Sequence, residues 1–195
     1  MCALDAGGIV IMRIIAGTAG GVRLEYKKGG PRATLERVKE SYFNAIHFAM
    51  QGAQALDLFA GSGQLGLEAL SRGAAHAVFV DASAECVQII RRNAEKCGFG
   101  RKCTVALNDW RQYVNEWRRR GGGAKFDVIF LDPPFGEIPI DEVLEKVVGA
   151  GMISNGGLLV CESEKAVEWP GYTAKHYKYG KIFISILRKD VEVDG

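Results

Sequence analysis

The sequence lacks the features that mark membrane-spanning, secreted and zinc-binding proteins. No apolar run approaches the roughly 18 residues that a membrane-spanning helix needs. The opening MCALDAGGIVI has no basic region before its apolar residues, which is atypical of a secretion signal. The five cysteines form no CxxC pair, and the three histidines have no metal-ligand spacing. These absences favour a cytoplasmic protein with free thiols and no metal.

Charge is unevenly distributed along the 195 residues. From Arg13 to Lys39 there are seven basic and two acidic residues, a local charge of +5, which leaves −3 for the rest of a chain of net charge +2. A basic segment on a mildly acidic body is typical of a protein that binds a polyanion, although a solvated surface segment would look the same. The candidate phosphate-binding residues are Arg13, Arg23, Lys27, Lys28, Arg32 and Arg37.

Hydrophobic periodicity predicts an α/β protein with a small N-terminal addition. Residues 12–26 alternate and are broken by glycines, which predicts a β-hairpin, and Thr34 can cap a helix reaching about Met50. Repeated strand and helix patterns follow, predicting a parallel sheet that ends in a hairpin. The predicted strands are 55–60, 77–82, 103–109, 127–132, 157–164, 172–179 and 181–189, and the predicted helices are 64–72, 83–97, 110–120 and 140–149.

Three segments are expected along the chain. Residues 1–11 lie outside the pattern, so we expect a disordered extension or a natural start at Met12. Residues 12–50 are expected to form a basic arm of hairpin and helix that binds the polyanion, and residues 51–195 the main α/β domain. We expect a monomer without membrane attachment.

The first motif is a glycine loop that follows a strand and opens a helix. DLFAGSGQLG contains Gly61-x-Gly63-x-x-Gly66, a pattern that nicotinamide enzymes and other nucleotide-binding proteins share. Asp57 distinguishes between them, because a carboxylate would repel a pyrophosphate at this helix N-terminus. The same carboxylate would attract a ligand that carries an ammonium and a sulfonium. S-adenosylmethionine is such a ligand.

Aspartates stand at or near the ends of the first four strands of the predicted sheet: Asp57, Asp81, Asp109 and Asp132. The carboxyl ends of parallel strands meet at one edge, so these residues predict an acidic cleft for a cationic ligand. Asp81 suits ribose hydroxyls and Asp109 suits the adenine amino group. A single aspartate would more simply be a loop cap; four in register favour a site.

The second motif is DPPF, residues 132–135, after the apolar run Val128 to Leu131. Prolines cannot donate to a sheet ladder, so Asp132 must end its strand and a stiff loop must follow. If Asp132 and the Pro133 carbonyl each accept one N–H of a base amine, the nitrogen lone pair can point at a sulfonium methyl group. Phe135 would stack on the base, a contact of about 1 to 3 kcal/mol.

Together these residues resemble a known family. DLFAGSGQLGLEALSRGA with DPPF is similar to class I S-adenosylmethionine-dependent methyltransferases that modify amines, and MRIIAGTAGGVRL with RATLERVKESYFNAI resembles the RsmD family. The resemblance spans Met12 to about Arg188 and implies a Rossmann-like, seven-stranded, mostly parallel sheet with helices on both faces and an antiparallel last strand. It also implies methylation of guanine N2 in 16S ribosomal RNA, on free RNA or an assembled small subunit. The implied cofactor residues are Asp57, Phe59, Ala60, Gly61, Ser62, Gly63, Asp81, Ala82, Asp109 and Trp110, and the implied catalytic residues are Asp132, Pro133, Pro134 and Phe135.

Three alternatives stay open from the sequence. DPPF also suits adenine N6, cytosine N4 or a glutamine amide as the methyl acceptor. The glycine loop suits a nucleotide-binding oxidoreductase, which would leave Asp57 and Asp132 without a role. An RNA-binding assembly factor could retain the fold without catalysis.

Overall fold

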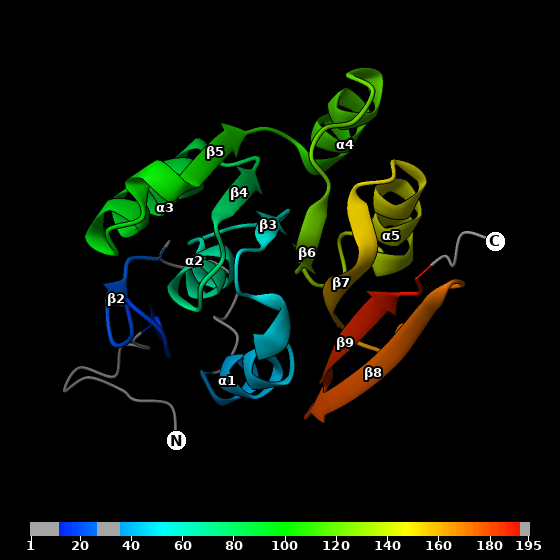
Figure 1. The fold of residues 1–195 in the computed structure, drawn as a ribbon, viewed down its shortest axis with the longest axis horizontal. Coiled ribbons are helices and arrows are strands. Elements are labelled where there is room, and N and C mark those ends of the chain that lie inside the picture. Colours follow the sequence, from blue (N-terminus) through cyan, green and yellow to red (C-terminus); the bar gives the residue numbers. More distant parts are fainter. Residues whose placement is uncertain (1–11, 27–35, 192–195) are drawn as a thin grey trace.

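A seven-stranded sheet dominates the computed structural model, which describes residues 12–26 and 36–191 (Figure 1). The strands are β1 (Met12–Arg13), β2 (Arg23–Leu24), β3 (Gln54–Asp57), β4 (His76–Asp81), β5 (Cys103–Leu107), β6 (Phe126–Leu131), β7 (Ile153–Ser163), β8 (Tyr172–Tyr179) and β9 (Ile182–Lys189). The α-helices are α1 (Glu36–Ala45), α2 (Gln64–Ser71), α3 (Ala84–Lys96), α4 (Trp110–Arg119) and α5 (Ile140–Gly149). Every helix in these ranges is too short or too polar to span a bilayer.

The strand order is β5-β4-β3-β6-β7-β9-β8. Strands β3 to β7 are parallel, and β9 lies antiparallel between β7 and β8. This confirms the predicted class, the mostly parallel sheet and the antiparallel last strand. The chain runs outward from β3 to β5 and then returns to place β6 on the other side of β3. Ligands bind at such a switch in strand order, beyond the carboxyl ends of the strands.

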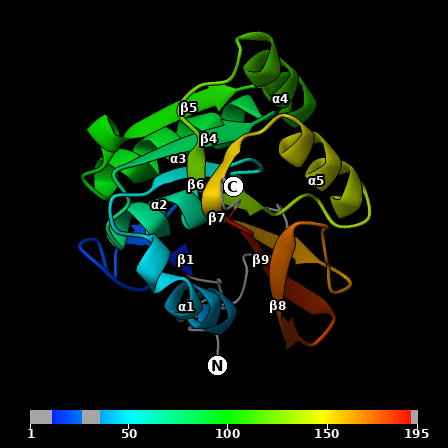
Figure 2. The ribbon, with the colours of Figure 1, turned by 45° about the vertical axis from the view of Figure 1, so that its right-hand side comes forward.

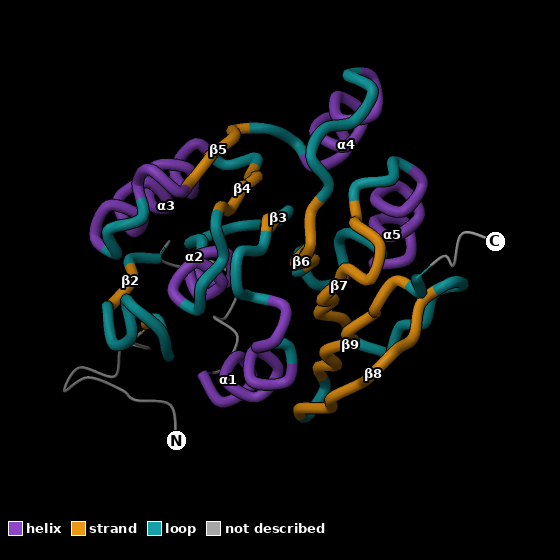
Figure 3. The backbone as a smooth tube through the Cα atoms, viewed as in Figure 1, coloured by secondary structure: helices purple, strands orange, loops and turns teal. Residues whose placement is uncertain are grey.

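Helices cover both faces of the sheet (Figure 2). One core contains apolar residues of α1, α2 and α3, and the other contains those of α4 and α5. The central strands β3, β4 and β6 lie between these two groups of helices in the tube drawing (Figure 3). Strand β6 is buried on both sides, with Val128 and Phe130 in the first core and Ile129 and Leu131 in the second. This explains its unbroken apolar sequence.

The N-terminal hairpin is present as the two-residue pair β1 and β2. The helix after it is shorter than predicted: α1 ends at Ala45, and a 3-10 turn spans His47–Ala49. Thr34, the predicted cap, lies outside the described residues. Lys39 does not belong to the basic surface, because its side chain is 1% exposed.

Lys39 belongs instead to a buried joint around Glu68 of α2. Glu68 accepts hydrogen bonds from the backbone N–H groups of Ile15 and Ala16 and from Arg72, and its carboxylate lies 3.4 Å from the Lys39 ammonium. Lys39 also donates to the carbonyl of Arg13. A fully buried carboxylate is tolerated only when it is paired in this way. The joint fixes the segment after β1 and helix α1 onto the helix that follows the glycine loop.

Candidate functional site

The glycine loop connects β3 to α2 and takes backbone conformations that favour glycine. Gly61 and Gly63 have φ values of 54° and 80°, in the left-handed region. Gly66 has a different reason: a Cβ there would overlap the ring of Phe79. The three glycines therefore allow a tight turn and the close packing of α2 on β4.

Asp57, the last residue of β3, is buried under this loop. Its side chain is 1% exposed and accepts a hydrogen bond of 3.1 Å from the Gly66 N–H. Burial raises the pKa of Asp57 from 3.8 to about 7, the Gly66 hydrogen bond opposes that rise, and the charge of Asp81 adds to it. The carboxyl group is thus poised to ionise when a cation faces it.

Asp81 and Asp109 accept hydrogen bonds from backbone N–H groups as well as lining the site. Asp81 accepts hydrogen bonds from the N–H groups of Gly61 (2.7 Å) and Ser83 (2.8 Å), which ties the glycine loop to the end of β4. Asp109 caps α4 by accepting from Arg111 and Gln112. The strand before Asp109 stops at Leu107, two residues earlier than predicted, because Asp109 has already turned to cap the helix. The loop-capping interpretation therefore also holds for these two aspartates.

The DPPF segment follows β6 directly. Asp132 is half-buried, Pro133 is buried, and the Phe135 ring is 44% exposed. Among the described residues, no hydrogen bond to the Asp132 carboxyl group is found. Burial raises the pKa of Asp132 well above its ordinary value, and the charges of Glu162 and Asp57 raise it further.

One cavity of about 700 Å³ brings the predicted residues together. All four aspartates line it, as do Phe59, Ala60, Gly61, Ser62, Ala82, Trp110, Pro133, Pro134 and Phe135. Gly63 does not line the cavity; it is the N-cap residue of α2 and contributes its backbone conformation. Segments separated by up to 78 residues thus meet at one edge of the sheet, from Asp57 to Phe135.

The cavity also has walls that the sequence did not reveal. Met12 and Tyr26 come from the N-terminal hairpin and its exit, Lys181 from the turn between β8 and β9, Ile182 from the start of β9, and Glu162 from β7. Only Glu162 had a usable signal. Like the four aspartates, it is a carboxylate near the carboxyl end of a buried strand, but it lies on the fifth strand of the predicted sheet.

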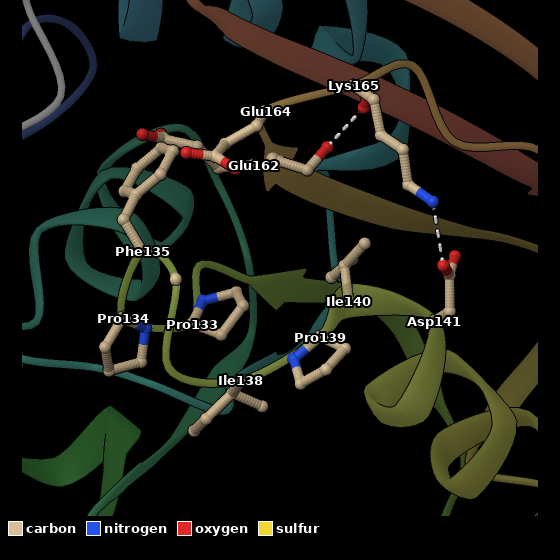
Figure 4. Close-up of a pocket in the computed structure, with 12 residues that line it drawn as sticks. Pro133, Pro134, Phe135, Ile138, Pro139, Ile140, Asp141, Glu162, Glu164 and Lys165 are labelled. Atoms are coloured by element: carbon tan, nitrogen blue, oxygen red, sulfur yellow. Dashed lines mark hydrogen bonds and ion pairs between the residues drawn. The ribbon is translucent and has the colours of Figure 1, made fainter.

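A second cavity of about 390 Å³ lies against the first (Figure 4). The two share Pro133, Pro134, Phe135, Ile138, Glu162 and Glu164. In Figure 4 the side chains of Glu162 and Glu164 extend toward the Phe135 ring, and Lys165 turns away to pair with Asp141 at 3.0 Å. The DPPF loop is therefore bordered on two sides by open space.

The candidate phosphate-binding residues fall into two groups. Arg23 and Arg37 are exposed, and Arg13 is exposed but paired with Glu36 at 2.9 Å. Lys27, Lys28 and Arg32 lie outside the described residues.

A cationic nucleoside cofactor fits the large cavity on three observations. Its size suits a ligand of nucleoside dimensions, and its four carboxyl groups suit an ammonium, a ribose diol and an amine. In addition, the indole Nε1 of Trp110 is buried and has no hydrogen-bond partner within residues 12–26 and 36–191. A buried donor of this kind at a cavity wall can be satisfied by a ligand acceptor.

Comparison with known proteins gives the family. Residues 12–188 match the family model described as Conserved hypothetical protein 95. The chain belongs to this family. "Ribosomal RNA small subunit methyltransferase D" of Escherichia coli (strain K12) is 33% identical over 154 residues, which is 78% of this chain and 75% of that protein. YlbH of Bacillus subtilis (strain 168) is 38% identical over 160 residues, 82% of this chain and 86% of that protein.

Solved structures agree with this assignment. The structure of yhhF from Escherichia coli superposes with a TM-score of 0.79 and 27% identity, covering 93% of this chain and 99% of that one. The resemblance to the RsmD family is confirmed.

Proposed function

We propose that this RsmD-family chain transfers a methyl group from S-adenosylmethionine to the exocyclic N2 amine of a guanine in small-subunit ribosomal RNA. The observation that carries the proposal is the position of DPPF. Asp132 and Phe135 line the same cavity as the glycine loop and the three other aspartates. Cofactor and acceptor would therefore meet at the end of β6.

In the part of the cavity lined by the glycine loop, each of three aspartates would have a role in binding the cofactor. Asp57 would hold the ammonium, Asp81 the ribose hydroxyls and Asp109 the adenine amine, while Phe59 and Trp110, which also line the cavity, would supply apolar walls. The Asp81 hydrogen bonds to Gly61 and Ser83 hold this half in place before the ligand arrives. A preformed site loses less conformational entropy on binding.

In the part of the cavity lined by DPPF, the protein would position the acceptor amine of the base. S-adenosylmethionine supplies a methyl carbon on sulfur, and a carbon–nitrogen bond forms as the carbon–sulfur bond breaks and its electron pair stays on sulfur. Asp132 and the Pro133 carbonyl accept the two N–H groups, which directs the nitrogen lone pair. After transfer, the nitrogen loses one proton to Asp132 or to water. Positioning and local electrostatics supply most of the rate in such a displacement.

Phe135 and the basic residues would hold the RNA. An exposed ring beside the cavity is a stacking surface for a base that has left its helix. We assign residues 12–50 as the RNA-binding arm, with Arg13, Arg23 and Arg37 on the described surface, and residues 51–195 as the catalytic domain. The named relative "Ribosomal RNA small subunit methyltransferase D" supports the substrate class. The partner would be the small subunit or its RNA in the cytoplasm, bound by a monomer.

The deciding experiment uses radiolabelled S-adenosylmethionine and small ribosomal subunits from cells that lack this protein. We expect label in N2-methylguanosine after digestion to nucleosides. Label in N6-methyladenosine or N4-methylcytidine would change the acceptor. Cofactor binding without transfer to any RNA would support the assembly-factor alternative, and binding of a reduced nicotinamide instead would support the oxidoreductase.

A further inference from the structure

Glu162 in β7 lies beside Asp132, the residue that directly follows β6. Leu131 pairs with Cys161 in the parallel ladder, so Asp132 and Glu162 follow side by side at the carboxyl ends of the two strands. Neighbouring strands are about 4.8 Å apart. Side chains alternate, and Phe130 and Val160 lie in the same core, so Asp132 and Glu162 project from the same face of the sheet.

Glu162 also faces the space in which the acceptor base would sit. Its side chain is 8% exposed and lines both the 700 Å³ and the 390 Å³ cavities, on either side of the DPPF loop. Figure 4 shows its side chain extending toward the Phe135 ring. A base stacked on that ring would bring its hydrogen-bonding edge to the two carboxyl groups.

Two adjacent carboxyl groups, one buried at Glu162 and one half-buried at Asp132, raise each other's electrostatic cost of ionisation. After burial, the charge of Glu162 is the largest cause of the raised pKa of Asp132. Tyr42 of α1, fully buried under this face, also has a raised pKa because of burial and the charges of Asp132, Glu162 and Asp57. A ligand that donates a hydrogen bond to each carboxylate would stabilise both charges.

The bases differ in what they offer such a pair. Guanine presents two neighbouring donors on its Watson–Crick edge, N1–H and the N2 amine. Adenine and cytosine place an acceptor nitrogen beside their exocyclic amines. Ionised carboxylates only accept hydrogen bonds, so two of them side by side match a donor beside a donor.

We propose that Glu162 accepts the N1–H of the target guanine while Asp132 and the Pro133 carbonyl hold its N2 amine, which makes Glu162 a specificity-determining residue. This role rests on the proposed function. It adds a reason for guanine selection that DPPF alone does not contain, because DPPF suits any exocyclic amine.

The test compares two bases that share the acceptor amine. Small-subunit RNA is assembled into subunits with either guanosine or 2-aminopurine riboside at the nucleotide that the wild-type protein methylates. 2-Aminopurine keeps the amine at C2, but its N1 is an acceptor. The wild-type protein should prefer guanosine in kcat/KM by roughly 10- to 100-fold, the range for a hydrogen bond to a charged group.

Glu162→Gln should change that preference, because an amide can donate to the N1 of 2-aminopurine. We expect the ratio of the two kcat/KM values to shift toward 2-aminopurine by about tenfold or more relative to the wild-type protein. The missing O6 of 2-aminopurine affects both proteins alike and cancels in this comparison. Glu162→Ala removes the acceptor without adding a donor, so its ratio should lie between those of the wild-type protein and Glu162→Gln.

Two controls separate specificity from folding. S-adenosylmethionine affinity, measured by calorimetry, should stay within about twofold in both variants if each is folded. Glu145→Gln, on the exposed side of α5, makes the same chemical change outside the cavity and should keep the wild-type ratio.

The outcomes distinguish the two proposals. If the wild-type protein methylates guanosine and Glu162→Gln lowers kcat/KM for guanosine and for 2-aminopurine by the same factor, the role of Glu162 is wrong and the proposed function stands. If the wild-type protein transfers no methyl group to guanosine in small subunits, the proposed function fails and this role fails with it.

Discussion

The carboxyl groups in the two halves of the cavity differ in their hydrogen bonds to the backbone. In the half built from β3, β4 and the start of α4, Asp57, Asp81 and Asp109 each accept at least one backbone N–H. In the half built from β6 and β7, Asp132 has no such hydrogen bond among the described residues, and it stands beside Glu162. The first half is held together by the protein itself. In the proposed function, the carboxyl groups of the second half accept hydrogen bonds from the acceptor base, and this difference suits a cofactor pocket next to a reaction site.

The largest expected effect follows from removing the carboxylate of the second half. Asp132→Ala should lower methyl transfer by about 10²- to 10³-fold, because a group that positions the amine is lost. The affinity for S-adenosylmethionine, measured by calorimetry, should change little, since Asp132 is not among the groups assigned to the cofactor. Glu145→Ala on the exposed side of α5 is the matched control. An equal loss of cofactor affinity would show that the two halves are not separable.

A second prediction tests how tightly the first half is packed. Gly66→Ala places a methyl group in the ring of Phe79 and should lower the free energy of unfolding by about 1 to 3 kcal/mol. Combining it with Phe79→Leu should cost less than the sum of the two single changes. Chemical denaturation measures all three variants. Gly149→Ala in α5, where a Cβ has no neighbour within 4 Å, should be neutral or slightly stabilising; a loss as large as that of Gly66→Ala would contradict the packing argument.

A third prediction concerns the pH dependence of cofactor binding. The pKa of Asp57 is about 7 in the free protein, so lowering the pH from 8 to 6 protonates it and removes the charge that faces the ammonium. The affinity for S-adenosylmethionine should be about tenfold weaker at pH 6 than at pH 8. Asp57→Asn is the control: its affinity for S-adenosylmethionine, measured by calorimetry, should be weak and should not change between pH 6 and pH 8. An unchanged wild-type affinity across this range would remove Asp57 from the ammonium site.

The raised pKa of Asp57 makes the stability of the free protein change with pH in the direction opposite to that of cofactor affinity. A folded pKa of about 7 against an ordinary value of 3.8 favours the protonated folded state. Its contribution therefore makes stability fall as the pH rises from about 4 to about 7. Saturating cofactor should reduce this fall.

The smallest expected effect lies outside both halves, on the arm. Arg37→Gln should weaken binding to small-subunit RNA modestly and reduce the slope of log affinity against log salt by about one, because one phosphate contact is lost. Filter binding over a range of salt concentrations measures this slope. Arg119→Gln, exposed at the end of α4, should leave it unchanged. If both variants shift the slope equally, the contact surface is not confined to the arm.

The first half of the site could be predicted almost completely. The glycine spacing and the aspartates after apolar strands report local rules: glycine where φ is positive, a carboxylate where a parallel strand ends. Four of the residues that the sequence missed, Met12, Tyr26, Lys181 and Ile182, reach the cavity from the two hairpins at opposite ends of the chain. No local pattern marks such residues, because the way these hairpins pack against the sheet brings them there.

Local sequence patterns predicted the class of fold, the order of the strands along the chain and the aspartates at or just after the carboxyl ends of β3 to β6. These depend on periodicity, turn residues and strand ends, which act over a few residues. Only the tertiary structure decided that Lys39 is buried with Glu68 rather than displayed to RNA, and that Glu162 stands beside Asp132. Both results depend on contacts between segments 29 or 30 residues apart, where packing rather than local preference decides the surroundings of a charged side chain.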